Sequence, residues 1–260
     1  MQKKVNRVKR VIDTINDWHT CGKKSLVLLI DPDKENNAES IAKRIQLALT
    51  LGIEMIFVGG SLASNDQTKF VIQTIKNIAN IPVVLFPGGV SQVRGEADAI
   101  LFLSLISGRN PDFLIGQHVV AAPVIKKYGL ESISTGYLLI GNEPSSAAYV
   151  SNTSPIPEDK HELATATALA GEMMGQRLLF LDAGSGALNP ISAKTIKLIS
   201  KTVSLPVIVG GGIKKYGQAY DALMAGADVL VIGNAAESNP SVLKEIANAV
   251  KDVNEVLQVH

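Results

Sequence analysis

The sequence predicts a closed (β/α)8 barrel, and three observations lead to this fold class. Eight short apolar runs recur along the chain, and they are continuous rather than alternating, as strands buried on both faces should be. Amphipathic segments with helical spacing separate most of these runs. The length of 260 residues suits one barrel, and no linker rich in Gly, Ser or Pro divides the chain. We therefore expect a single α/β domain over residues 1–260.

The expected elements follow in chain order. Residues 1–20 place apolar side chains on one helical face and basic ones elsewhere, which is typical of a helix that caps a barrel. A helix that lies on a membrane surface is the alternative. Strands are expected at 25–30, 54–58, 82–86, 99–103, 133–140, 178–182, 206–209 and 228–232, with helices over 38–52, 68–80, 192–203 and 241–253.

Two intervals depart from this regular alternation. Residues 87–99 lie between the third and fourth strands and leave room for two helical turns at most, so the third helix of the barrel should be shortened. Residues 141–157 follow the fifth strand as a long segment without a periodic pattern. Such segments are often lids or binding loops, and a plain surface insertion is the alternative.

Residues 110–129 are apolar around more of their circumference than one barrel face needs. Asn110 and Pro111 provide a helix start and Gly129 an end, while Pro123 predicts a kink or break. We expect part of this surface to be buried in a homo-oligomer, either a dimer or a hexamer. A deeply packed helix in a monomer is the alternative.

Composition and charge narrow the class of protein. A formal net charge of +1 argues against a nucleic-acid binder that relies on bulk electrostatics. A single cysteine, Cys21, permits no internal disulfide and fits a reducing compartment. No apolar run approaches the roughly 20 residues of a transmembrane helix, and the N-terminus lacks the apolar core of a signal peptide. These features predict a cytoplasmic domain of enzyme size.

Glycine-bearing turns follow the last three expected strands. They are residues 183–187 after the acid Asp182, Gly210–Gly212, and Gly233 with Asn234. One such turn indicates little more than a tight strand-to-helix connection. Three turns on the same rim can direct backbone N–H groups at one phosphate, in the part of a barrel where phosphates often bind. The sequence therefore predicts a phosphate site, which a side chain at Gly212 or Gly233 should block.

The same rim carries candidate metal ligands. Asp31 ends the first strand, and Ser61 follows the second. A carboxylate and a hydroxyl near bound phosphates suit Mg²⁺, and an Asp-Pro turn that caps a helix is the alternative reading of Asp31. The four histidines lie outside every one of these motifs, which argues against chemistry centred on histidine.

Taken together, LLIDPDK, FVGGS, LFPG, ISTGYLLI, FLDAGSGA, VIVGGGIK and AGADVLVIGN resemble the geranylgeranylglyceryl phosphate synthase family, from about Ser25 to Asn234. The resemblance implies a modified TIM barrel in which an extended segment replaces the third helix. It implies transfer of a prenyl group from geranylgeranyl diphosphate to the 3-hydroxyl of sn-glycerol 1-phosphate, with Mg²⁺ as cofactor. A lipid product of this kind would also imply a peripheral contact with a membrane.

Carried over position by position, the resemblance assigns Asp31 and Ser61 to the metal. Phe180 and Asp182 depart from the tyrosine and glutamate that are usual in the family. Phe180 has no hydroxyl to offer the glycerol, and Asp182 reaches one methylene less far. The residues assigned to glycerol phosphate are Phe180, Leu181, Asp182, Ala183, Gly184, Ser185, Gly186, Gly211, Gly212, Gly233 and Asn234.

The implied chemistry gives Asp182 a role. A carboxylate next to the acceptor can take the proton of the attacking hydroxyl, or orient the diol, while the metal neutralises the diphosphate that leaves. Two other functions stay open at this point. One is a phosphate-barrel isomerase or lyase that acts on a sugar or indole phosphate. The other is a binding protein on the same fold that has lost turnover, and the departures at Phe180 and Asp182 are its only support.

Overall fold

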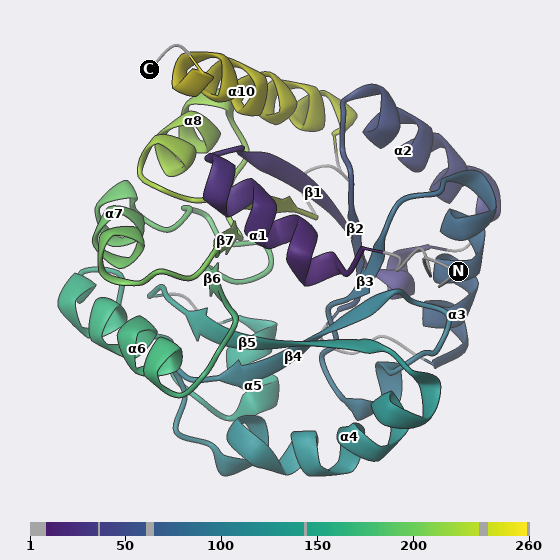
Figure 1. Ribbon diagram of the computed structural model, residues 1–260, viewed down its shortest axis with the longest axis horizontal. Helices are drawn as coiled ribbons and strands as arrows, with labels where there is room; N and C mark the ends of the chain where they lie inside the picture. The colour runs from purple at the N-terminus through teal and green to yellow at the C-terminus, as the bar shows by residue number, and fades with distance from the viewer. Residues whose placement is uncertain (1–8, 36, 61–64, 143–144, 234–238, 259–260) are drawn as a thin grey trace, which may run out of the picture.

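The computed structural model is a closed barrel of eight parallel strands in chain order, with helices around it (Figure 1). It describes the chain apart from residues 1–8, 36, 61–64, 143–144, 234–238 and 259–260. The predicted barrel is confirmed. The strands are β1 Ser25–Ile30, β2 Ile56–Val58, β3 Val83–Leu85, β4 Ala99–Leu105, β5 Glu131–Leu139, β6 Leu178–Asp182, β7 Val207–Gly210 and β8 Val229–Ile232.

Helices and short helical turns connect the strands on the outside of the barrel. In the described part of the chain, no helix is both long and apolar enough to span a membrane. The helices and turns are α1 Val11–Cys21, η1 Pro32–Lys34, α2 Ala38–Thr50, α3 Asn65–Ile78, η2 Val90–Gln92, η3 Asp112–Gly116, α4 Gln117–Tyr128, α5 Ser146–Ser151, α6 His161–Met173, α7 Ala193–Thr202, α8 Tyr216–Met224 and α10 Pro240–Gln258.

The apolar runs form strands because alternate side chains are buried in two separate layers. One layer fills the barrel interior and includes Phe57, Leu101 and Phe180. The other lies between the barrel and its helices and includes Leu28 and Leu181. A strand that is buried on both faces has no polar positions to alternate with apolar ones, which explains the continuous apolar runs in the sequence.

Helix α1 closes the end of the barrel where the strands begin (Figure 1). Its first N–H groups, on Val11 and Ile12, donate to the Glu131 carboxylate at 2.7 and 3.0 Å. This carboxylate, from the start of β5, satisfies donors that the first turn of a helix leaves open. At the other end of α1, His19 Nδ1 lies 2.8 Å from Asp228 Oδ2. With this end closed, the carboxyl ends of the strands are left to form a site.

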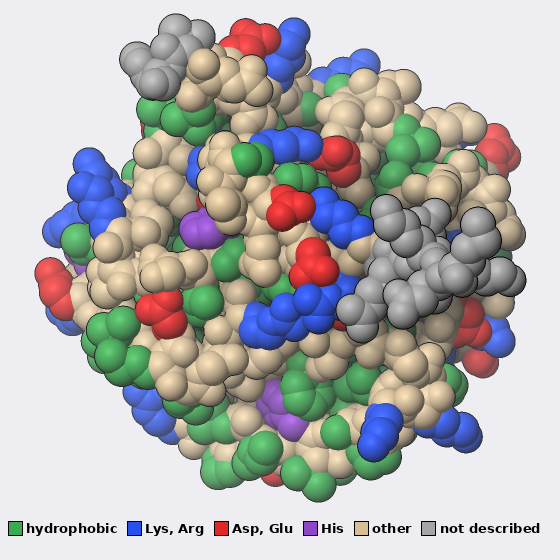
Figure 2. All heavy atoms as spheres, viewed as in Figure 1, with side chains coloured by type: hydrophobic (Ala, Val, Ile, Leu, Met, Phe, Trp, Pro, Cys, Tyr) green, Lys and Arg blue, Asp and Glu red, His purple; other side chains and the backbone are tan. Residues whose placement is uncertain are grey.

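The surface over α1 carries charges of both signs (Figure 2). Lys9 and Arg10 pair with Asp17 and Asp13, each with a nitrogen-to-oxygen distance of 2.7 Å. The described part of this surface is therefore mixed in charge rather than purely basic. The remaining basic residues expected on this helix lie within residues 1–8, outside the described part of the chain.

The connection between β3 and β4 is short, as the sequence predicts. It contains the single turn η2 instead of a crossover helix. Gln92 of this turn is buried, and its side chain accepts from Gly88 N at 3.1 Å and donates to Gly60 O at 2.8 Å. These hydrogen bonds attach the connection to the strand ends. Gly88, Gly89, Val90 and Val93 of this connection line the cavity described below.

Two segments differ in detail from the sequence prediction. Residues 141–157 contain the short helix α5, which Ser145 caps by accepting from Ala148 N at 3.2 Å. A six-residue helix is too short to show a helical period, so the pattern could not reveal it. Helix α4 continues through Pro123 without a break, and the π-type turn η3 comes directly before the helix, at Asp112–Gly116.

Candidate active site

A cavity of about 480 Å³ opens at the carboxyl ends of the strands. Turns after β6, β7 and β8 form one end of it, and this end is made of glycines and polar groups. The other end is apolar and lies where β4, η2 and α4 meet. Residues of the apolar end are Phe86, Val90, Val93, Ile100, Leu101, Phe102, Leu103, Leu105, Phe113 and Ala121. A ligand that fits this cavity has a compact polar part and an extended apolar part.

At Gly211 and Gly212 the turns pack against neighbouring segments so closely that a side chain cannot replace the glycine hydrogen. Gly211 and Gly212 have φ values of 80° and 72°, in the left-handed region that favours glycine. A Cβ at Gly211 would lie 2.6 Å from Asp182 Oδ1, and one at Gly212 would lie 2.3 Å from the carbonyl oxygen of Asn189. Gly233 differs, because a Cβ there would meet only Leu29, at an ordinary 3.5 Å. These turns therefore place backbone next to the cavity.

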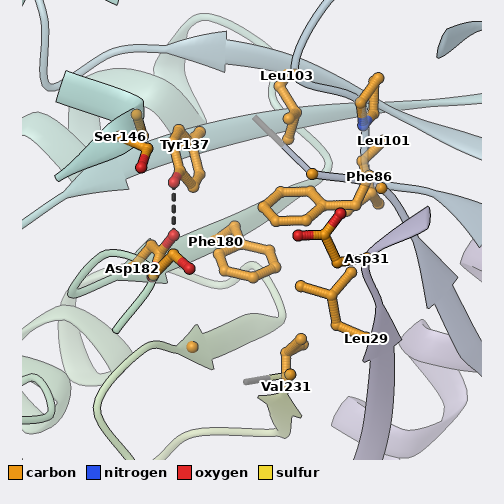
Figure 3. A pocket seen from close by; sticks show the side chains of 18 of the residues that line it. Leu29, Asp31, Phe86, Leu101, Leu103, Tyr137, Ser146, Phe180, Asp182 and Val231 are labelled. Atoms are coloured by element: carbon orange, nitrogen blue, oxygen red, sulfur yellow. Dashed lines mark hydrogen bonds between the residues drawn. The ribbon is translucent and has the colours of Figure 1, made fainter. Parts of the chain in front are cut away.

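Asp182 ends β6 at the wall of this cavity (Figure 3). Its Oδ2 accepts from the Tyr137 hydroxyl at 2.6 Å, and its Oδ1 accepts from Gly184 N at 2.8 Å. Burial raises the pKa of the Asp182 carboxyl above its ordinary value, while the hydrogen bonds from Tyr137 and Gly184 act in the opposite direction. A carboxyl group with a raised pKa at a cavity wall is suited to accept or hold a proton.

Three aromatic rings form the cavity wall between the two ends. Phe180 stacks on Phe86 with ring centroids 4.8 Å apart and an interplanar angle of 9°. Tyr137 meets both rings edge-on, at 6.0 Å from Phe86 and 5.7 Å from Phe180. Figure 3 shows Asp182 on one side of the stacked pair and Asp31 on the other. The two carboxylates therefore serve different parts of the cavity.

Asp31 caps the turn η1 and also lines the cavity, so the capping reading of the sequence does not rule out contact with a ligand. Its Oδ1 accepts from Asp33 N at 3.2 Å, and its Oδ2 lies 3.6 Å from Lys34 Nζ. A Cβ at Gly60 would come within 2.6 Å of Oδ1, so the glycine leaves room for this carboxylate. The side chain of Asp31 is about one quarter exposed. It can therefore reach a ligand while it caps η1.

The donor set at Asp31 fits a magnesium ion that a substrate helps to bind. Asp33 also lines the cavity, so carboxylate oxygens are available on this side. Among the described residues, no three His, Cys, Asp or Glu side chains gather closely enough to bind a metal by themselves. Mg²⁺ commonly uses one or two carboxylates together with substrate phosphates and water. Asp31 would be its ligand here, and Ser61 lies outside the described residues.

The cavity brings most of the predicted site residues together. Leu181 and Ala183 do not line it. Leu181 is fully buried against the helices, because alternate positions along β6 point to opposite faces. Asn234, like Ser61, lies outside the described residues. The predicted residues that do line the cavity are Asp31, Phe180, Asp182, Gly184, Ser185, Gly186, Gly211, Gly212 and Gly233.

Tyr137 and His118 are among the cavity residues that the sequence prediction did not include. Tyr137 pairs with Phe180 in the β5–β6 register, which puts it on the same face as Asp182, two residues further on. The signal in the sequence that could have identified it was a tyrosine within an apolar strand.

His118 lies at the apolar end of the cavity, with Nε2 3.1 Å from Ser104 Oγ and its ring edge-on to Phe102. Burial lowers the pKa of His118, which favours the neutral ring expected in an apolar wall.

Comparison with known proteins gives one consistent set of relatives. The model of the PcrB family matches residues 16–253. A geranylgeranylglyceryl phosphate synthase of Chitinophaga pinensis is 49% identical over 250 residues, which cover 96% of this chain and 99% of the relative. The synthase of Pyrococcus abyssi is 38% identical and covers 94% of this chain and 99% of its own length.

A solved structure shows the same architecture. It is the (S)-3-O-geranylgeranylglyceryl phosphate synthase of Thermoplasma acidophilum, in complex with its substrate sn-glycerol-1-phosphate. It superimposes with a TM-score of 0.88 at 29% identity, covering 94% of this chain and all of the other. The chain therefore belongs to the PcrB family, and its curated relatives are geranylgeranylglyceryl phosphate synthases.

Proposed function

We propose that this protein transfers the prenyl group of geranylgeranyl diphosphate to the 3-hydroxyl of sn-glycerol 1-phosphate, which gives geranylgeranylglyceryl phosphate and diphosphate. The observation that carries the proposal is one cavity with a glycine-rich polar end and a long apolar end. A phosphate monoester suits the first, and a prenyl chain suits the second. The reaction needs both ligands in contact, and this cavity is continuous between its two ends.

Different residues of the cavity would carry out the binding, proton-transfer and metal-binding parts of this reaction. The turns at Gly184–Gly186, Gly211–Gly212 and Gly233 would hold the phosphate of the acceptor, which brings its glycerol hydroxyls to Asp182. The acceptor oxygen attacks the allylic carbon as the bond to diphosphate breaks, and Asp182 accepts the hydroxyl proton. Mg²⁺, held by Asp31 with Ser61 as the proposed second ligand, would neutralise the charge of the leaving diphosphate.

The apolar end of the cavity favours this reaction over the other barrel chemistries. A sugar or indole phosphate would use the glycine turns but would leave the wall from Leu101 to Leu105 and Phe113 without a partner. Incubation with Mg²⁺, labelled sn-glycerol 1-phosphate and prenyl diphosphates of increasing length separates the candidates. A transferase forms a labelled lipid, whereas an isomerase or lyase, or an inactive binding protein, leaves the label in water-soluble form.

Gly233 offers the cleanest test of the phosphate site. Gly233→Val fits the fold, because its Cβ would meet only Leu29 at 3.5 Å, but it fills space at the polar end of the cavity. We expect the KM for sn-glycerol 1-phosphate to rise about 10- to 100-fold, which is the change expected when a hydrogen bond to a charged group is lost. Gly212→Val is a poorer choice, because its Cβ would overlap the backbone of Asn189.

Gly217→Val is the matched control, because a Cβ at this position in α8 meets no heavy atom within 4 Å and Gly217 does not line the cavity. It should keep the KM of the unmodified protein. A folded Gly233→Val protein with an unchanged KM would remove the turn after β8 from the phosphate site.

We also propose that η3 and α4 form the contact between copies of this chain. Ile115, Val119 and Val120 are more than half exposed, at 60%, 66% and 62%, although all three are apolar. Light scattering should therefore give a multiple of 27.6 kDa. The double variant Val119→Lys, Val120→Lys should shift the particle towards the monomer. Met173→Lys, at an exposed position of α6, is the control. A 27.6 kDa particle at high protein concentration would refute the assembly.

The proposed location of the reaction is the cytoplasm. Cys21 is a free, exposed thiol, which a reducing compartment preserves.

The lipid product would leave through a peripheral contact with a membrane. Tyr149 of α5 is 89% exposed next to the cavity residue Val150, and we propose it as part of that contact.

A further inference from the structure

The hydroxyl of Tyr137 is a hydrogen-bond donor in an otherwise apolar part of the cavity wall. The residue is buried, lines the cavity and donates to Asp182 Oδ2 at 2.6 Å. Gly184 N donates to the other oxygen, Oδ1, at 2.8 Å. Each oxygen of the carboxylate thus has one fixed donor, so the orientation of the group is set. A lone pair remains on each oxygen for a ligand in the cavity.

Packing alone does not require this hydroxyl. The ring of Tyr137 meets Phe86 and Phe180 edge-on, with interplanar angles of 69° and 61°. A phenylalanine at this position would keep both ring contacts and lose only the donor to Asp182. The hydroxyl group therefore contributes something other than apolar packing to the wall (Figure 3).

We propose that Tyr137 is a positioning residue, whose hydroxyl orients the Asp182 carboxylate and keeps it ionised so that it can accept the proton of the acceptor hydroxyl. This role rests on the proposed prenyl transfer. Asp182 touches the acceptor, and Tyr137 acts through it.

The charges around Asp182 support this role. Burial raises its pKa, and the Tyr137 hydroxyl is the first of the two hydrogen bonds that oppose the rise. Burial and the neighbouring Asp182 carboxylate raise the pKa of Tyr137 well above its ordinary value, so the hydroxyl stays a donor through the neutral range. The other titratable side chains that line this cavity are Asp31, Asp33, Lys34, His118 and Lys214.

Removal of the hydroxyl should therefore change the pH dependence and not only the rate. In Tyr137→Phe the carboxyl loses a donor that favours its ionised form, so the pKa of Asp182 rises further. The acid limb of kcat/KM for sn-glycerol 1-phosphate should move to higher pH by roughly one to two pH units. Activity below the midpoint should fall about 10- to 100-fold, and part of it should return at alkaline pH.

Tyr216→Phe is the matched control, because the Tyr216 hydroxyl makes a similar bond to Asp252 Oδ2, at 2.7 Å, on the exposed surface. Its pH profile should equal that of the unmodified protein. A folded Tyr137→Phe protein with the unmodified profile would overturn the proposal. A loss that is uniform across pH would overturn it as well, because the hydroxyl would then have no effect on the ionisation of Asp182.

Calorimetric titration of sn-glycerol 1-phosphate across pH gives a readout that does not depend on prenyl transfer. The acid weakening of binding should move to higher pH in Tyr137→Phe relative to the unmodified protein. If that shift occurs in a protein that forms no prenyl ether, the proposed reaction fails while the coupling between Tyr137 and Asp182 stands. If binding shows no shift, the coupling fails whatever the reaction.

Discussion

Asp31→Ala is expected to abolish prenyl transfer and to leave the binding of sn-glycerol 1-phosphate nearly intact. Asp31 lies across the Phe86–Phe180 pair from Asp182 (Figure 3), which fits its proposed role at the diphosphate and not at the acceptor. Without this carboxylate the proposed Mg²⁺ would lose its assigned charged ligand, and the charge of the leaving diphosphate would be less well neutralised. Steady-state rates and acceptor calorimetry on the same preparation measure the two effects.

Asp31→Asn separates the metal role from the capping role. Asparagine caps a helical turn as well as aspartate does, so it keeps the hydrogen bond from Asp33 N but removes the negative charge. We expect it to be as inactive as Asp31→Ala. An active Asp31→Asn protein would make Asp31 a capping residue. Full turnover in the presence of a chelator would require the metal assignment of both Asp31 and Ser61 to be abandoned.

Asp182→Asn has the second largest expected effect. The amide keeps the size of the side chain. Its one oxygen can still accept from Gly184 N, and its NH2 group can donate to the Tyr137 hydroxyl oxygen, but it cannot take a proton from the acceptor. We expect kcat to fall on the order of 10²–10⁴-fold, which is the usual contribution of a general base to the rate. A loss confined to KM would mean that Asp182 only positions the diol. No change in either constant would refute a functional role for Asp182.

The stability of the Asp182→Asn protein gives an independent reading of the same residue. A carboxyl whose pKa is raised by folding stabilises the fold at low pH, and this contribution is lost as the pH rises through the folded-state pKa. Above that pKa the ionised group costs stability. We therefore expect the thermal midpoint of Asp182→Asn at neutral pH to match or exceed that of the unmodified protein. A clear decrease would show that the carboxylate is needed for the fold.

The barrel and the polar end of the site could be predicted from the sequence because their signals are local. Strands buried on both faces appear as continuous apolar runs, and turns with left-handed backbone, such as Gly211–Gly212, require glycine. The Asp31 turn is equally local, since its cap is two residues away. Each of these features can be recognised without knowing which strands are neighbours.

The remaining features depend on register and packing between distant segments. Tyr137 reaches Asp182 because β5 and β6 pair with Tyr137 beside Phe180, and no local pattern fixes that register. His118 enters the cavity wall only because α4 packs near the open side of the short β3–β4 connection. The Leu181 side chain does not line the cavity although the motif includes it, because alternate side chains of a strand face opposite layers.

The departures at Phe180 and Asp182 also find a structural explanation. Phe180 offers no hydroxyl and instead stacks on Phe86. A hydroxyl is nevertheless present at the shortened acid, and Tyr137 supplies it from the neighbouring strand. The Asp182 carboxylate thus has a phenolic donor that comes from the neighbouring strand β5.

The most direct test of the central claim follows the acceptor oxygen. The protein is incubated with Mg²⁺, geranylgeranyl diphosphate and sn-glycerol 1-phosphate that carries ¹⁸O in its 3-hydroxyl, and the organic extract is analysed by mass spectrometry. Prenyl transfer predicts an ether that retains the ¹⁸O, formed in equal amount with unlabelled diphosphate. Recovery of unchanged glycerol phosphate from a folded protein that binds it, with no ether at any prenyl length, would contradict the account.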